Sequence, residues 1–150
     1  MTSGTLDERT RGMTEPTFSL KSVDASTTLE FFGHIPNGLN DWDGTTLSVS
    51  LSGGPVSASV NAYDVRLGHW AEFFATLAST WHSLSGPLDI ESLEGHVRLS
   101  AAVDRQGHVS LSVRLRGVDS STGWLAEDVI ALEVGQLDSI AKAAFSFFAK

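Results

Sequence analysis

Much of the chain from Thr17 onward alternates between apolar and polar residues, which is the pattern of half-buried β-strands. In the first such segment Phe18 and Leu20 share one side, while Ser19 and Lys21 share the other. Two later segments flank Gly53-Gly54 and are expected to form a hairpin. The predicted strands cover residues 17–21, 26–34, 45–52, 56–62, 97–103, 109–115 and 124–134.

Two segments follow a helical repeat instead. Apolar residues recur from Leu67 to Trp81 at helical spacing, and this predicts an amphipathic helix of about four turns that ends before Gly86-Pro87. The C-terminal segment, residues 136–150, predicts a second helix. Its apolar positions are Leu137, Ile140, Ala141, Ala144, Phe145 and Phe148.

The order of these elements predicts an α+β protein. We expect a largely antiparallel sheet of about six or seven strands, with two amphipathic helices packed on one face in a two-layer arrangement. Residues 16–150 should form a single domain, preceded by a flexible tail at residues 1–15, which show no periodicity.

The triplet Gly-His-Val occurs twice, at residues 95–97 and 107–109, within one predicted hairpin. Alternation around a turn at residues 104–107 places both histidines on the outer face, with His96 opposite Arg114 and His108 opposite Ala102. The histidines are then roughly 20 Å apart along the strands. Zinc–nitrogen bonds are about 2 Å long, so one ion cannot bind both. No metal site and no cofactor are predicted.

The charge of the chain is strongly acidic. Its 18 acidic residues outnumber 10 basic ones, for a net charge of −8. This balance argues against nucleic acid as a partner and is compatible with a basic protein, although acidity for solubility alone is the simpler explanation. There is no cysteine, no apolar segment long enough for a membrane span and no secretory signal, so a cytoplasmic location is expected.

No catalytic residue is predicted. The chain lacks the G-x-S-x-G, G-x-x-x-x-G-K-[ST] and G-x-G-x-x-G motifs. Residues 40–44 superficially resemble a calcium loop, but the sixth and twelfth positions counted from Asp41 are Thr46 and Ser52. The pattern requires glycine and glutamate there.

Two surface sites are candidates for binding. An acidic rim at the strand ends would attract a basic partner if its members converge in space; it comprises Asp41, Asp43, Asp89, Glu91 and Glu94. The alternative is the outer face of the hairpin, which could bind an acidic or phosphorylated group or simply discourage aggregation. It carries His96, Arg98, Arg114 and Arg116.

Three segments, residues 71–84, 90–115 and 124–141, resemble an uncharacterised family of small bacterial domains. More distantly they resemble WapI-type immunity proteins, which neutralise toxins. The resemblance rests on the aromatic helix ending near Trp81, the Glu-Gly-His hairpin and the Leu-Glu-x-Gly-Gln-Leu step into the last helix. It implies a non-enzymatic, cytoplasmic protein whose partner is a basic toxin domain.

The leading functional hypothesis is therefore a non-catalytic, immunity-like protein-binding domain. A small-molecule or anion-binding domain that uses the outer arginines is the alternative, and an enzyme is third. The sequence leaves the oligomeric state open.

Overall fold

Two four-stranded antiparallel sheets form the framework of the protein, as a computed structural model shows. The structure describes residues 16–36, 38, 44–64, 66–117 and 123–148. The α+β class and the antiparallel pairing are confirmed, but the prediction of one sheet of six or seven strands is wrong. The predicted tail at residues 1–15 lies outside the described residues.

Each sheet is a simple up-and-down meander whose strands pair in chain order. The first sheet comprises β1 (Thr17–Lys21), β2 (Thr27–Pro36), β3 (Thr45–Gly53) and β4 (Val56–Asp64). The second comprises β5 (Leu88–Glu91), β6 (Val97–Val103), β7 (His108–Arg116) and β8 (Leu125–Glu133).

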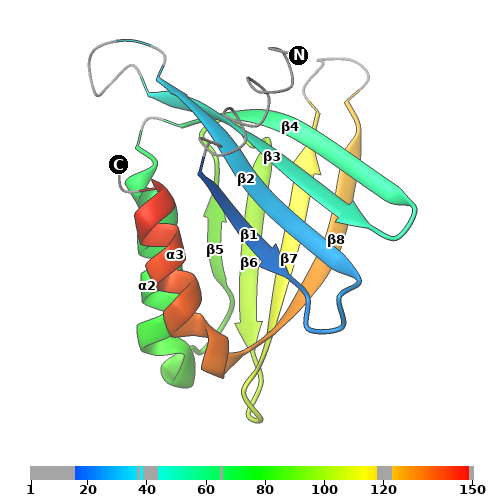
Figure 1. Cartoon of the computed structure of the whole chain (residues 1–150). Coiled ribbons are helices and arrows are strands. Elements are labelled where there is room, and N and C mark those ends of the chain that lie inside the picture. The colour runs from blue at the N-terminus through cyan, green and yellow to red at the C-terminus, as the bar shows by residue number, and fades with distance from the viewer. Residues whose placement is uncertain (1–15, 37, 39–43, 65, 118–122, 149–150) are drawn as a thin grey trace, which may run out of the picture.

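A helix separates the two meanders in sequence. The four residues of β5, which follow Gly86-Pro87, were not predicted, and their pairing with β6 begins the second sheet. The sheets lie one behind the other with their strands crossing obliquely (Figure 1). This arrangement lets both apolar faces cover each other.

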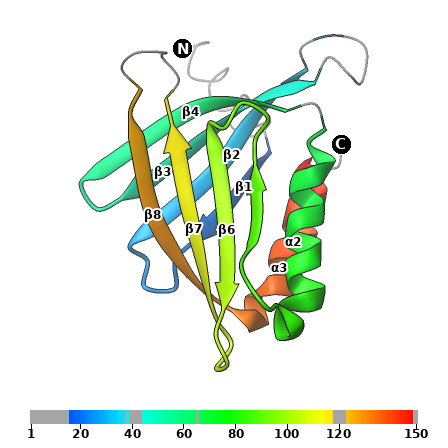
Figure 2. The same cartoon turned by 180° about the vertical axis from the view of Figure 1, so that it is seen from behind.

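Two helices run side by side along one flank of the crossed sheets (Figures 1 and 2). The first, α2 (Gly68–Thr80), continues into the 3₁₀ turn η2 (Trp81–Ser83), close to the predicted end. The second, α3 (Leu137–Phe148), follows the 3₁₀ turn η3 (Val134–Gln136). The helices contact each other, α2 contacts β5, and α3 contacts β1.

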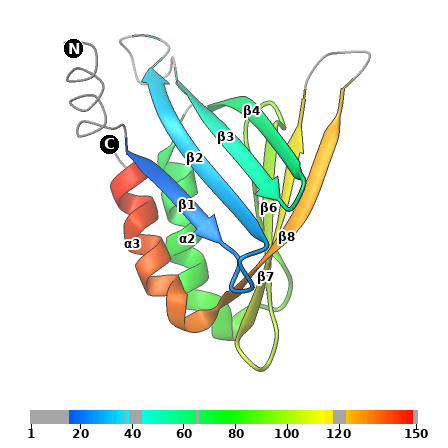
Figure 3. The same ribbon diagram turned by 45° about the vertical axis from the view of Figure 1, so that its right-hand side comes forward.

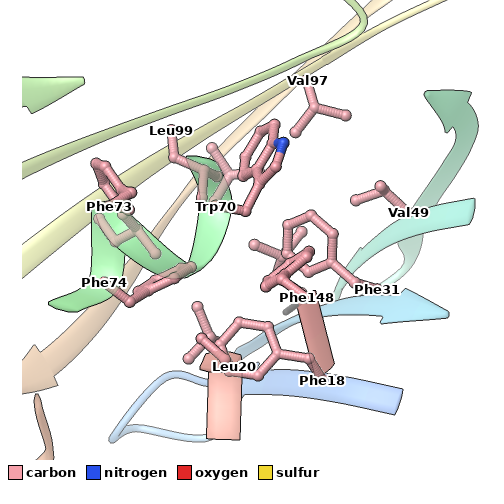
Figure 4. Packing of buried hydrophobic residues seen from close by; sticks show 14 of the residues in the cluster. Phe18, Leu20, Phe31, Val49, Trp70, Phe73, Phe74, Val97, Leu99 and Phe148 are labelled. Atoms are coloured by element: carbon pink, nitrogen blue, oxygen red, sulfur yellow. The ribbon is translucent and has the colours of Figure 1, made fainter. Parts of the chain in front are cut away.

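The core forms where both sheets and both helices meet. Phe31 and Val49 from the first sheet, Val97 and Leu99 from the second, and Trp70 from α2 converge there (Figure 4). The alternation in the strands therefore identified the buried faces correctly, because removing these apolar side chains from water is the main stabilising contribution.

Phe145 is a correction to the predicted apolar stripe of α3. Its side chain is 67% exposed, whereas Phe147 and Phe148 are buried. Leu137, Ala144, Phe147 and Phe148 are the buried residues of α3. Their helical spacing places Phe145 on the opposite, outer side of the helix.

The β6–β7 hairpin also differs from the predicted register. Arg98 lies opposite Arg114, and Ala102 lies opposite Ser110, two residues from the expected partners. The backbone N–H of Asp104 donates to the carbonyl of His108 at 3.0 Å. The Asp104 carboxylate also accepts a hydrogen bond from the His108 N–H at 2.9 Å. The loop between the paired residues of β6 and β7 is therefore longer than the alternation predicts.

Candidate functional site

An open groove between α2 and β5 collects several acidic side chains of the described residues. It has a volume of about 450 Å³. We call it the acidic groove; its lining includes Asp64, His69, Glu72, Asp89, Glu91 and Leu93. None of the described residues that line it is a lysine or an arginine.

Strand alternation places two of the carboxylates in the groove. In β5, Asp89 and Glu91 are exposed, while Leu88 and Ile90 are partly buried against the core. The exposed side chain of Leu93 follows in the β5–β6 turn, where 61% of it is accessible. One wall of the groove therefore combines negative charge with an exposed apolar side chain.

Helix α2 and the end of β4 supply the opposite wall. Glu72 and His69 lie on the polar side of α2, and Phe73 beside them is buried. Asp64 ends β4 and is only 8% exposed. Its carboxylate accepts a hydrogen bond from the indole N–H of Trp70 at 3.2 Å, which satisfies a polar atom of the core.

Asp89 is held in its charged form by its neighbours. The Ser100 hydroxyl donates to its carboxylate at 2.5 Å, and the Arg98 guanidinium donates at 3.2 Å. The Ser100 hydrogen bond, helped by Arg98, lowers the pKa of Asp89 against the opposing effect of partial desolvation. This carboxylate is therefore ionised at neutral pH.

Two arginines at the rim reduce the negative charge of the groove without cancelling it. Arg98 pairs with Asp89, and Arg66 lies 3.8 Å from Glu72. Both side chains of the Arg66–Glu72 pair are more than half exposed, so the pair contributes little. The groove therefore has more carboxylates than nearby cations.

The structure brings together only part of the predicted acidic rim. Asp89 and Glu91 share the acidic groove, whereas Glu94 lies exposed in the turn after β5 and does not line it. Asp41 and Asp43 lie outside the described residues.

Sequence reasoning missed two members of the groove, Asp64 and Glu72. His69 and Glu72, three residues apart, lie exposed on the polar side of α2. Nothing in the chain indicated that this side would face β5, because the contact depends on the unpredicted strand.

The outer arginine face is a second hollow, of about 610 Å³, on β6, β7 and β8. Arg98 and Arg114 lie opposite each other there. Each is paired: Arg98 with Asp89 at 3.2 Å, and Arg114 with Glu127 at 2.9 Å. An incoming anion would compete with these carboxylates, so the face is less basic than its sequence indicates.

The remaining members of the predicted arginine face lie near one end of the second sheet. Arg116 ends β7, and His96 lies in the β5–β6 turn. The backbone N–H of Arg116 donates to the carbonyl of His96 at 2.8 Å. Neither residue lines the hollow that contains Arg98 and Arg114.

A search of the described ranges for groups of three or more His, Cys, Asp or Glu side chains able to hold a metal finds none. Over the same ranges, every helix is too short or too polar to cross a membrane.

The fold and the groove define an α+β protein built from two antiparallel meanders, with open charged surfaces. The chain belongs to a family of unknown function, DUF6228, which matches residues 20–150. This match agrees with the predicted resemblance to an uncharacterised family of small domains, but it carries no link to WapI-type immunity proteins. A search of curated proteins gives no match.

Proposed function

We propose that this chain is a protein-binding domain that holds a basic segment of another protein in the acidic groove between α2 and β5. The observation that supports the proposal most directly is the lining of the groove. Asp89, Glu91 and Glu72 surround an opening whose rim carries exposed Leu93.

These features suit a segment in which lysine or arginine alternates with apolar residues. The carboxylates would attract the cationic groups and increase the association rate, while Leu93 would contact an apolar side chain. The net charge of −8 also attracts a basic segment at long range.

The toxin-neutralising form of this proposal is narrower. It holds that the basic segment belongs to a bacterial toxin domain and that binding blocks the toxin. It rests on the sequence resemblance alone. The general proposal of a protein-binding groove does not depend on it.

Anion binding at the outer arginine face is the weaker alternative. Its two central arginines already contact Asp89 and Glu127, so binding would have to compensate for the loss of both pairs. The acidic groove needs no such displacement at Glu91, for which the described residues show no ion pair or hydrogen bond.

The proposal is tested with an octalysine peptide as the probe and calorimetry as the measurement. We expect the Glu72→Lys/Glu91→Lys double variant to bind it at least about tenfold more weakly than the wild type, since two attractive charges become repulsive. Glu30→Lys/Asp138→Lys is the matched control, because both residues lie outside the groove lining; Asp138 is exposed and Glu30 is partly buried.

Both double variants change the net charge by the same amount. A larger loss of affinity in the groove variant than in the control supports the proposal. Equal losses would show that the peptide responds only to total charge, and they would overturn it.

A further inference from the structure

The two halves of the chain repeat the same ββββα unit; the first, second and fourth strands correspond at a spacing of 70 residues, and the third strands, β3 and β7, at 62. Phe18 pairs with Phe31 in the first half, and Leu88 pairs with Ala101 in the second, each residue 70 positions later. Inner residues of β4 and β8 keep the spacing of 70, as do the buried pairs Phe74/Ala144 and Leu77/Phe147 of α2 and α3. Equivalent positions include Val60 and Ile130, Ala62 and Leu132, and Leu67 and Leu137.

The first turn of each half has the same hydrogen bonds. Ser22 N–H donates to the carbonyl of Thr27 at 2.9 Å, and Ser92 N–H donates to that of Val97 at 2.9 Å. Val23 and Leu93 are the exposed apolar residues at the equivalent positions of these turns, 53% and 61% accessible. The two halves can therefore be compared position by position.

The outer edge of the second sheet is covered by the first half. The N–H of Val23 donates to the carbonyl of Ala131 in β8 at 2.8 Å, and the N–H of Ala131 donates to the Ser22 hydroxyl at 2.9 Å. Figure 3 shows the β1–β2 turn beside β8. Both backbone groups of Ala131 that point away from the sheet are thus satisfied.

The corresponding edge of the first sheet lacks this cover. Asn61 in β4 is equivalent to Ala131, and Leu93 is equivalent to Val23. Among the described residues, the turn that contains Leu93 makes no backbone hydrogen bond to β4. Ser92 instead accepts the N–H of Val97 within its own hairpin at 3.1 Å.

The two edge strands also differ in charge. β8 carries Glu127, Asp128 and Glu133, and Asp128 points toward the other sheet, where it accepts a hydrogen bond from Thr27 at 2.9 Å. Charges of this kind prevent a free edge from pairing with another strand. β4 has no charged residue from Val56 to Tyr63.

The backbone groups that face the free edge of β4 follow from its hairpin. Gly53 pairs with Val56 across a two-residue turn, so these residues form a hydrogen-bonded pair and alternate positions point the other way. Ser57, Ser59, Asn61 and Tyr63 therefore direct their N–H and C=O groups away from β3. They form a row that an added strand could pair with.

We infer that β4 binds its partner by strand addition, with an extended basic segment pairing along Ser57–Tyr63. Carboxylates lie near both ends of this strand. Val56 and Ala58 share a hollow with Glu127 and Asp128, and Asp64 lines the acidic groove. Among the described residues, neither hollow is lined by lysine or arginine, although Arg114 pairs with Glu127 at 2.9 Å. A second copy, with its own charge of −8, would be repelled, whereas a lysine-rich strand is complementary.

This inference rests on the proposed function and adds the mode of binding. Its probe is an octapeptide of alternating lysine and valine, and its readout is NMR-detected amide hydrogen exchange. We expect slowed exchange at the four edge-facing amides. Ser59→Pro removes one of these donors and should weaken binding about tenfold, while Ser59→Thr keeps the donor and should not.

The outcomes separate the two proposals. One outcome supports the groove and overturns strand addition. In it, the peptide binds the wild type and binds the Glu72→Lys/Glu91→Lys variant more weakly, but amide exchange in β4 does not change and Ser59→Pro binds the peptide as well as the wild type does. If a serine–valine peptide bound as tightly as the lysine–valine peptide and slowed amide exchange in β4, strand addition would be supported and recognition by charge would be overturned. No binding of the lysine–valine peptide contradicts both.

Two further measurements keep the test decisive. Slowed exchange in the wild-type protein decides the location of binding even if Ser59→Pro does not fold. Sedimentation shows whether the free chain is a dimer; pairing of two β4 edges would overturn the choice of a basic partner.

Discussion

At the scale of single residues, the repeated turns hold two equivalent positions in a left-handed conformation. Ala25 has a φ of 61° and Gly95 a φ of 78°. Glycine adopts this region without steric cost, whereas alanine brings its Cβ too close to the following carbonyl oxygen.

We therefore expect opposite effects from exchanging these residues. Ala25→Gly should stabilise the protein by about 1 kcal/mol, and Gly95→Ala should destabilise it by about 1 kcal/mol or more. An added Cβ at Gly95 would also lie 3.3 Å from the ends of the Arg116 and Glu91 side chains. Urea unfolding of both variants gives the two free energies; a loss of stability in Ala25→Gly would contradict the assignment.

The residue patterns were more successful at predicting the buried side of each strand than at predicting contacts between elements. Leu47, Val49 and Leu51 are buried as the alternation requires. The exposed positions of Asp89 and Glu91 follow the same rule in a strand that was not predicted. Their neighbour Glu72 comes from a helix, and no periodicity in the chain links it to them.

At the scale of elements, the β6–β7 loop depends on the carboxylate of Asp104. It accepts the N–H of Gln106 and that of His108, both at 2.9 Å, and it contacts the His108 ring at 3.1 Å. These interactions, with the His108 N–H first, lower the pKa of Asp104.

A lowered pKa in the folded state makes this contribution to stability depend on pH. It is fully present above the ordinary value of 3.8 and is lost as the pH falls through the lower folded value. Asp104→Ala should therefore lower the urea midpoint at pH 6, and the difference from the wild type should shrink toward pH 2. A difference that is constant across this range would show that the charge of Asp104 does not support the loop.

Strand length determined which strands, and therefore which sheets, could be predicted from the sequence. The long strands were all identified, but β5 has only four residues, and alternation cannot establish a segment that short. Without β5 the second meander lacks its first strand. A single sheet was then the simpler arrangement, although helix α2 separates two complete meanders.

At the scale of the whole molecule, two matched halves meet asymmetrically. The first turn of one half covers the edge of β8, whereas within the described ranges the equivalent turn makes no backbone hydrogen bond to β4. Each helix contacts the first strand of the other half, and the acidic groove lies where α2 meets β5. The two binding surfaces that we propose are the groove between α2 and β5 and the open edge of β4.

The central claim is that a basic segment binds in the acidic groove, and backbone NMR mapping of the octalysine complex tests it most directly. We predict large shift changes on residues 69–76 and 88–93, next to the groove carboxylates, and strand addition predicts further changes on residues 57–63 of β4. Changes centred instead on Ser112, Arg114 and Val129 would place the peptide on the outer arginine face and contradict the account.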